Sequence, residues 1–172
     1  NRGATFGTQQ QLSSVDRNVG ATSIAADSSN RIVVVWNEYD ADATAGNPAF
    51  KARASSNGGT SFGTETTLST SEDYNVFFAT VAADGNGGFF ASWRRTAGDG
   101  FYRIVISDSS NGGSTWSTPE EVDNDVDVDF RASPWVTADG ADVAVVWSDR
   151  DSTTSASSDQ DIFFTASGNG GD

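Results

Sequence analysis

The sequence predicts an all-β fold built from repeated units of four short antiparallel strands. The chain has 172 residues, of which 18 are glycine, and it is rich in Ser, Thr, Asn and Asp, which is typical of many tight turns. Between these turns lie short runs of Val, Ile, Phe and Trp, which favour β-strands over helices. The same order of runs and turns recurs along the chain, and a chain of this length can bury one core that such repeats share.

A glycine-rich turn motif marks the boundaries of the repeats. Complete copies lie at 55–62 (SSNGGTSF) and 109–116 (SSNGGSTW). The first six residues, NRGATF, match the end of the motif, and residues 167–172, SGNGGD, match its beginning. Because the interval between copies is nearly constant, the motif predicts a single unit over 1–172. Its repeats lie at approximately 5–62, 63–116 and 117–172.

A second landmark recurs at the same interval. In each repeat a short small-residue segment ending in Asp is followed by a turn and then by an apolar run that ends in tryptophan, at Trp36, Trp93 and Trp147. Runs such as 32–36 (IVVVW) and 143–147 (VAVVW) have apolar residues on both faces of a strand, as in strands buried between two layers. We therefore expect these tryptophans to pack in the core. An aromatic platform for a sugar ring is the alternative.

Local alternation of apolar and polar residues, together with the positions of turn residues, divides each repeat into four strands. Four-stranded antiparallel sheets at this spacing are typical of β-propeller blades, which pack around a central axis. The expected strands are 5–12, 21–26, 31–36 and 49–54 in the first repeat, 65–68, 79–83, 89–93 and 101–107 in the second, and 120–122, 135–138, 143–147 and 162–166 in the third.

The turn motif resembles the Asp-box, Ser-x-Asp-x-Gly-x-Thr-Trp, of the sialidase-like β-propellers, and the resemblance extends over essentially the whole chain. The sequence departs from the family pattern because Asn57, Asn111 and Asn169 stand where the family has aspartate. Asparagine keeps a side-chain oxygen that accepts hydrogen bonds within a turn, so the expected fold is unchanged. The resemblance implies a structural turn between the third and fourth strands of a blade. The residues that form it here are Ser55, Asn57, Gly59, Phe62, Ser109, Asn111, Gly113, Thr115, Trp116, Ser167 and Asn169.

The resemblance also implies how the protein assembles. Propellers of this family have six blades, whereas this sequence contains three repeats. The strand order implies that the chain begins with the outermost strand of one blade and ends after the third strand of another. Exposed strand edges promote association, so we expect a homodimer in which residues 5–12 complete the last blade of the partner, closing a six-bladed ring. An excised or engineered half of a longer propeller, with no ligand, is the alternative.

Charge and composition exclude several classes of function. The formal net charge is −14, from 24 acidic and 10 basic residues, which disfavours binding to nucleic acid or to an anionic membrane surface. The chain contains no Cys and no His, so it has no disulfide, no histidine-ligated zinc and no Ser-His-Asp triad. The acidic composition suits a secreted, extracellular protein, and the first residues do not form a signal peptide.

The face opposite the motif turns gathers charged and aromatic residues that follow the apolar strands. The resemblance implies that ligands bind on this face, and carboxylates beside guanidinium groups are suited to a sugar or a peptide. A solvated acidic rim without a ligand is the alternative. The candidate ligand-binding residues are Glu38, Tyr39, Asp40, Arg94, Arg95, Asp149 and Arg150.

Glycoside hydrolysis in the family uses an arginine triad, a tyrosine nucleophile paired with glutamate, and an aspartate acid/base. Residues of these types occur at Arg131 and among the candidates above, but their arrangement does not match. The family signature Phe/Tyr-Arg-Ile-Pro is represented only by 130–134 (FRASP), which has one residue too many between Arg and Pro. We therefore expect no catalytic residues and a non-catalytic protein. A sialidase-like glycoside hydrolase, or a fragment of one, is the alternative.

One acidic segment is a candidate metal site. Asp125, Asp127 and Asp129 alternate with valine, so in an extended segment their carboxylates share one face. Adjacent carboxylates repel one another unless they are solvated or bridged by a hard cation such as Ca²⁺. The segment lacks the glycine and the terminal glutamate of an EF-hand loop. A solvated acidic loop is therefore the expectation, calcium is the alternative, and no other cofactor is expected.

Overall fold

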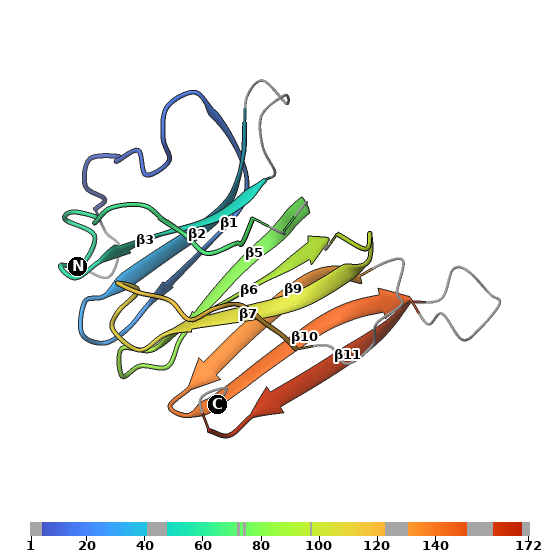
Figure 1. Ribbon diagram of the computed structural model, residues 1–172. Coiled ribbons are helices and arrows are strands. Elements are labelled where there is room, and N and C mark those ends of the chain that lie inside the picture. Colours follow the sequence, from blue (N-terminus) through green and yellow to red (C-terminus); the bar gives the residue numbers. More distant parts are fainter. Residues whose placement is uncertain are drawn as a thin grey trace.

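The computed structural model describes residues 5–40, 48–71, 73, 75–96, 98–122, 131–150 and 160–169. These residues form antiparallel sheets that lie side by side as successive layers (Figure 1). The sheets follow one another in chain order. Their first strands, β1, β5 and β9, are neighbours and form the inner edge of the stack.

The first sheet has the order β1-β2-β3-β4, with β1 at Arg17–Ala26, β2 at Ile32–Asp40, β3 at Ala49–Ser55 and β4 at Thr66–Thr67. The second has the order β5-β6-β7-β8, with β5 at Asn75–Ala83, β6 at Phe89–Thr96, β7 at Tyr102–Ser109 and β8 at Glu120–Glu121. The third has the order β11-β10-β9, with β9 at Arg131–Asp139, β10 at Asp142–Arg150 and β11 at Gln160–Ser167.

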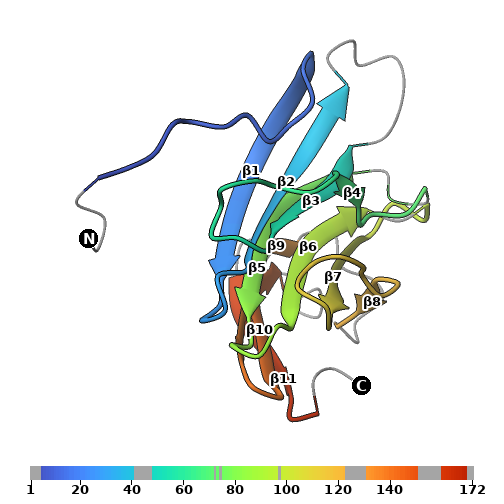
Figure 2. The same ribbon diagram turned by 90° about the vertical axis from the view of Figure 1, so that its left-hand side faces the viewer.

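The all-β fold and the four-stranded antiparallel sheets are confirmed, and of the expected strands only 5–12 has no counterpart. Within this chain residues 5–12 form no strand, and their expected pairing with a partner copy stays a prediction. Residues 5–12 instead lead toward the first sheet (Figure 2), where the Gln10 side-chain amide donates to the Gly59 carbonyl at 2.7 Å. The edge that they were expected to extend, β11, lies in the third sheet at the other end of the stack. The segment therefore has no strand edge to pair with inside its own chain.

The first and second sheets pack through an apolar layer. Successive side chains of a strand point to opposite faces, so Val33 and Val35 of β2 face the second sheet and meet Trp93 of β6. The Phe50 ring of β3 stacks on Trp93 with 4.5 Å between the ring centroids. Burial of these side chains provides the driving force that holds the two sheets together.

The second and third sheets pack in the same manner. Phe90 of β6 and Ile104 of β7 meet Val145 and Trp147 of β10. In the second and third sheets, the face that carries the tryptophan thus packs against the preceding sheet in the chain.

The recurrent tryptophans are buried. The exposed fractions of Trp36, Trp93 and Trp147 are 2%, 0% and 7%. The expectation of core packing is therefore confirmed, and a sugar platform at these positions is excluded because a sugar ring needs an accessible aromatic face.

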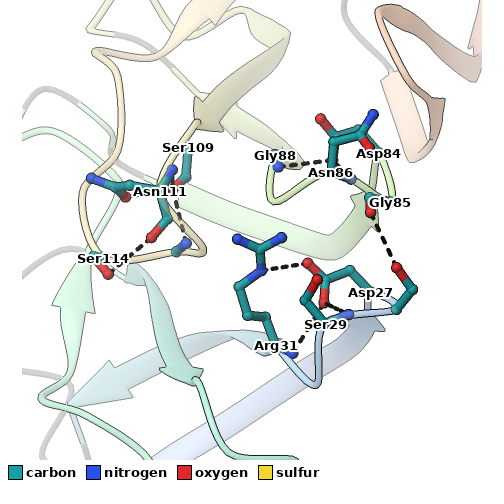
Figure 3. Close-up of polar contacts among 12 residues, drawn as sticks. Asp27, Ser29, Arg31, Asp84, Gly85, Asn86, Gly88, Ser109, Asn111 and Ser114 are labelled. Atoms are coloured by element: carbon teal, nitrogen blue, oxygen red, sulfur yellow. Dashed lines mark hydrogen bonds and ion pairs between the residues drawn. The ribbon is translucent and has the colours of Figure 1, made fainter.

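Hydrogen-bonded turns close the strands at one end of the sheets, here called the turn end (Figure 3). In the β1–β2 turn the Asp27 carboxylate accepts hydrogen bonds from the backbone N–H groups of Ser29 at 2.8 Å and Arg31 at 3.0 Å. It also accepts from Arg31 Nε at 2.5 Å. Burial opposes ionisation of Asp27, but the hydrogen bonds from Arg31 and Ser29 outweigh it and lower the pKa of this carboxyl.

Turns of neighbouring sheets are bonded to one another. The Ser28 hydroxyl donates to the Gly85 carbonyl at 3.5 Å, which links the first sheet to the second (Figure 3). The Gly140 N–H donates to the Asp84 carbonyl at 3.0 Å, which links the second sheet to the third. Hydrogen bonds at the turn end therefore join neighbouring sheets in addition to the apolar core.

The first complete copy of the glycine-rich motif forms a compact turn at this end. The Ser55 hydroxyl accepts from the Gly59 N–H at 2.9 Å and donates to the Asn57 side-chain oxygen at 2.9 Å. That oxygen also accepts from the Ser61 N–H at 2.9 Å, while Asn57 Nδ2 donates to the Ser61 hydroxyl at 2.8 Å. Asparagine therefore supplies the acceptor that the turn needs, together with an N–H donor that aspartate lacks.

The other copies repeat these contacts. In the second copy the Asn111 side-chain oxygen accepts from the Ser109 hydroxyl at 3.0 Å and from the Thr115 N–H at 2.9 Å. Asn111 Nδ2 donates to the Thr115 hydroxyl at 2.7 Å. In the third copy the Ser167 hydroxyl donates to the Asn169 side chain. The two complete copies thus form the same set of hydrogen bonds, and the described part of the third copy repeats the contact between serine and asparagine.

Gly113 is expected to be intolerant of a side chain. It has a φ of +83°, and a Cβ at this position would lie 2.6 Å from Val33 Cγ2 and 3.0 Å from Ala54 Cβ. Gly113→Ala should therefore lower the free energy of unfolding by about 2–4 kcal/mol, because backbone strain adds to overpacking. Gly100 has a φ of +86° with nothing within 4 Å, so Gly100→Ala should cost only about 1–2 kcal/mol. Urea unfolding measures both, and equal losses would contradict the packing role of Gly113.

Asp27→Asn is expected to have a pH-dependent effect. Because the folded pKa of Asp27 is lowered from 3.8, its contribution to stability is present above that value and is lost as pH falls through the folded pKa. Wild type should exceed Asp27→Asn in stability at neutral pH, and the difference should shrink below pH 3.8. Asp84 bonds the N–H groups of Asn86 and Gly88, which an amide oxygen can also accept. Asp84→Asn should therefore cost less. Denaturant unfolding across pH tests this, and a pH-independent difference for Asp27→Asn would refute it.

Candidate functional site

The end of the sheets opposite the turns, here called the loop end, carries a group of aromatic side chains around one buried cation. β2 and β6 end here, and β5 and β7 begin here (Figure 1). The cation is Arg94, near the end of β6. In the β5–β6 register Arg94 lies opposite Phe77.

Aromatic rings enclose the Arg94 guanidinium. Its central carbon lies 4.4 Å from the centroid of the Tyr102 ring and 4.9 Å from the centroids of Phe77 and Phe78. Burial lowers the pKa of Arg94, and the phenol groups of Tyr102 and Tyr39 act in the opposite direction. The electron-rich ring faces attract the cation and compensate in part for its removal from water. The rings therefore hold Arg94 in a defined position.

Tyr39 connects the first sheet to this group. Its ring centroid lies 6.2 Å from that of Phe77, with the planes tilted by 48°. Burial raises the pKa of the Tyr39 phenol above its usual 10.0, and the Arg94 charge opposes that shift. The phenol is therefore protonated at neutral pH and can donate a hydrogen bond. The residues Tyr39, Phe77, Phe78, Arg94 and Tyr102 are called the Arg94 cluster below.

Phe78 has an unusual backbone conformation. Its φ is +61°, in a left-handed region that costs a bulky residue about 1–3 kcal/mol. The register between β5 and β6 shifts between Phe77 and Thr80, which marks a β-bulge. Bulges next to binding sites re-aim side chains, and the Phe78 side chain is one of the large apolar groups left exposed. A strained, exposed aromatic residue beside a buried arginine is suited to contact a ligand.

Two of the predicted ligand-binding residues, Tyr39 and Arg94, meet in the Arg94 cluster. Glu38 does not join them. Its buried carboxylate accepts a hydrogen bond from Trp36 Nε1 at 3.1 Å and lies 3.6 Å from Arg17 Nε. Glu38 is therefore committed to contacts inside the first sheet.

Arg95 is also committed to internal contacts. It pairs with the buried Asp73 at 3.0 Å and with Glu121 at 2.7 Å. Burial opposes its charge, but Glu121 and Asp73 outweigh this and raise the pKa of Arg95. Because successive side chains of β6 alternate, Arg95 points to the face opposite that of Arg94.

The remaining predicted residues lie outside the Arg94 cluster or outside the described structure. Asp149 is buried on β10, and by alternation it shares the face of Trp147. The side chains of Asp40 and Arg150 lie outside the described residues, as do Asp125, Asp127 and Asp129. Among the residues that are described, no group of three or more acidic side chains could hold a metal ion. No helix long and apolar enough to cross a membrane occurs in that part of the chain.

Sequence reasoning missed Phe77, Phe78 and Tyr102. Phe77 and Phe78 precede the small-residue segment of the second repeat, so aligning the repeats would have placed them at the loop end. Tyr102 follows the Asp99-Gly100 turn and pairs with Thr96, which also places it there. Their convergence on Arg94 depends on the strand register and on the bulge, which the sequence pattern does not reveal.

Comparison with known proteins gives matches at the level of structure. No family model matches the sequence, and no curated protein matches it. Among solved structures, the N-acetylgalactosamine deacetylase from F. plautii matches with a TM-score of 0.58 and 14% identity over 93% of this chain. The Hadza microbial sialidase Hz136 matches with a TM-score of 0.56 and 13% identity over 87%. The Penicillium chrysogenum α-L-arabinanase matches with a TM-score of 0.53 and 12% identity over 87%.

The chain spans only part of each of these structures: 52% of the deacetylase, 32% of the sialidase and 42% of the arabinanase. At these identities the matches establish the fold. This chain therefore has the fold of the sialidase-like β-propellers.

Proposed function

We propose that this protein is a non-catalytic β-propeller module that binds carbohydrate at its loop end through the Arg94 cluster. We further propose that its sheets are three blades and that two copies close into a six-bladed ring. The Arg94 cluster is the observation that carries the binding proposal. The structural neighbours support a carbohydrate ligand in general terms, because a sialidase, a deacetylase of N-acetylgalactosamine and an arabinanase are each named for action on carbohydrate.

The chemistry of the Arg94 cluster suits a sugar. The C–H faces of a sugar ring pack against aromatic rings, and its hydroxyl groups accept hydrogen bonds from guanidinium and phenol donors. Phe78 is exposed, Tyr39 is half-buried and Arg94 is held between rings. These side chains are rigid, so they lose little conformational entropy when a ligand binds.

Two observations favour binding without catalysis. Glycoside hydrolysis through a tyrosine nucleophile requires an activating base, and the raised pKa of Tyr39 opposes its ionisation. The adjacent carboxylate, Glu38, is occupied by Trp36 and Arg17. Within the described part of the chain, the ring contacts of Arg94 come from Phe77, Phe78 and Tyr102, whereas glycosidases ordinarily use a pair of carboxylates.

Uncovered apolar side chains favour ring closure. Ile24 of the first sheet is 65% exposed, and Phe164 of the third sheet is 68% exposed. On the third sheet Trp135 and Ile162 are exposed as well, and contiguous exposed apolar side chains mark interaction surfaces. The third sheet also ends at β11 without a fourth strand among the described residues. We propose an extracellular location as well, which the acidic composition supports.

Phe78→Ala is expected to weaken glycan binding by about tenfold, because an aromatic contact contributes roughly 0.5–1.5 kcal/mol beyond its area burial. A glycan array identifies the ligand, and titration calorimetry with the best-bound glycan measures the affinity. The same preparation should not hydrolyse that glycan, and turnover would contradict the non-catalytic assignment.

Phe101→Ala is the matched control for this test. Phe101 also lies beside an arginine, with 5.7 Å between its ring centroid and Arg103. Arg103, however, pairs with Asp99 at 2.8 Å, and neither belongs to the Arg94 cluster. Phe101→Ala should leave affinity unchanged. Equal weakening by both substitutions, or binding unaffected by Phe78→Ala, would refute the proposed binding site.

The ring proposal predicts the mass in solution. The chain has a mass of 18.0 kDa, so static light scattering should give twice that value at micromolar concentration. Because each copy carries a net charge of −14, added salt should screen the mutual repulsion and increase the dimer fraction. A mass of 18.0 kDa at every concentration and salt level would contradict closure by two copies.

A further inference from the structure

The two outermost sheets each leave one face without a neighbour (Figure 1). On the first sheet this face carries Ile24 of β1, which lies directly opposite Val34 of β2. On the third sheet it carries a row that crosses all three strands, because Val146 of β10 lies opposite both Trp135 of β9 and Phe164 of β11. Trp135 is 68% exposed. The uncovered face of the third sheet is therefore apolar across all three strands. On the first sheet the apolar part is confined to β1 and β2, because Arg53 and Lys51 of β3 lie opposite Val34 and Trp36.

The two internal interfaces follow one packing rule. Where the second sheet meets the first, the face of Phe89 and Trp93 packs on the face of Val33 and Val35. Where the third sheet meets the second, the face of Val145 and Trp147 packs on the face of Phe90 and Ile104. In both cases the tryptophan face of the later sheet packs on the face of the earlier sheet that lacks the recurrent tryptophan.

One of the two uncovered faces is a tryptophan face, and the other is a face that lacks the recurrent tryptophan. In the first sheet, Val34 and Trp36 occupy the positions that Ala91 and Trp93 occupy in the second repeat, so the uncovered face is a tryptophan face. Trp36 itself is already buried within its own chain, and Ile24 and Val34 form the accessible part. In the third sheet, Val146 and its neighbours Trp135 and Phe164 lie on the other face. The ends of the stack are therefore complementary and not identical.

We infer that these two faces are the two halves of a single kind of interface, formed head to tail between two copies of this chain. The inference rests on the proposed ring and specifies which faces meet in it. A second copy placed in this way covers both faces of the first copy at once, because its own uncovered faces are the same pair. Closure then occurs through two equivalent interfaces, with no uncovered face left to extend the assembly.

The internal interfaces also predict which residues meet. At the inner edge the Ser23 hydroxyl of β1 accepts a hydrogen bond from the Val81 N–H of β5 at 3.2 Å. In the repeat alignment Ile24 corresponds to Val81, and Trp135 of the third repeat corresponds to Ser23. Ile24 of one copy is therefore placed beside Trp135 of the other.

Engineered cysteines test this pairing directly, because the chain has no natural cysteine. A variant that carries both Ile24→Cys and Trp135→Cys should form a covalent dimer under mild oxidation, since neighbouring strands bring Cα atoms within disulfide reach. Either substitution alone should not, because head-to-tail packing never brings two copies of the same residue together. Ile24→Cys combined with Ser110→Cys is the matched control, since Ser110 is exposed at the turn end. Non-reducing gels and light scattering give the readout.

The outcomes separate the inference from the proposal on which it rests. Cross-linking only in the paired variant supports both. If a variant with only one of the two cysteines forms a covalent dimer, the same face of each copy meets in the interface. That result overturns the inference, while the proposal that two copies associate stands. Monomers without cross-links, or a ladder of larger species, overturn both.

Charged substitutions give a second test that does not depend on disulfide geometry. Ile24 and Trp135 are exposed in the single chain, so Ile24→Asp and Trp135→Asp leave its core intact, which circular dichroism verifies. Each variant alone should raise the dimer dissociation constant by at least about tenfold, because every interface then contains one buried charge. A mixture of the two should recover dimers, because one of the two interfaces in the mixed dimer is unmodified. Failure of the mixture to recover, or an effect of only one variant, would overturn the inference.

Discussion

The stacking of Trp93 on Phe50, and the apolar contacts around it, is the interaction on which the rest of the structure depends. A sheet with two apolar faces is not stable in water by itself, and it must be covered on both sides. Trp93 and Phe50 meet with 4.5 Å between their ring centroids and join the first sheet to the second. Trp147 performs the equivalent role one sheet later. Because each sheet presents its tryptophan face to the sheet before it, the stack has a direction, and its two ends are different.

This packing leaves the two ends of the strands with different roles. At the turn end, hydrogen bonds around Asp27 order the β1–β2 turn (Figure 3). The bonds from Ser28 to Gly85 and from Gly140 to Asp84 join neighbouring sheets there. At the loop end the sheets are held mainly by side chains. There the inner strand β5, displaced by its bulge, brings Phe78 beside Arg94. A rigid scaffold at one end thus positions a small group of aromatic and cationic side chains at the other, which is a common arrangement for binding sites.

Most of the strands could be predicted because each repeat contains the same local signals. Alternation, turn residues and the recurrent tryptophans located β2, β6 and β10 independently in each repeat. Residues 5–12 form no strand within this chain, because alternation shows only that a segment can pair and pairing also needs an available edge. The expected pairing with the edge of a partner copy stays a prediction. In the candidate site, Arg94 and Tyr39 were recognised by residue type. Glu38 and Arg95 were grouped with them because all four follow apolar strands and were expected at the same end of the sheets, although successive side chains of a strand alternate between faces.

Sequence by itself determined the all-β fold, the repeat and the burial of the tryptophans, because these depend on local propensity and on periodic apolar patterns. Tertiary structure decided which side chains meet. The convergence of Phe77, Phe78 and Tyr102 on Arg94 depends on strand register and on a bulge. The uncovered state of Ile24 depends on which sheet has no neighbour. Both are set by contacts between residues far apart in the chain, and no local pattern specifies them.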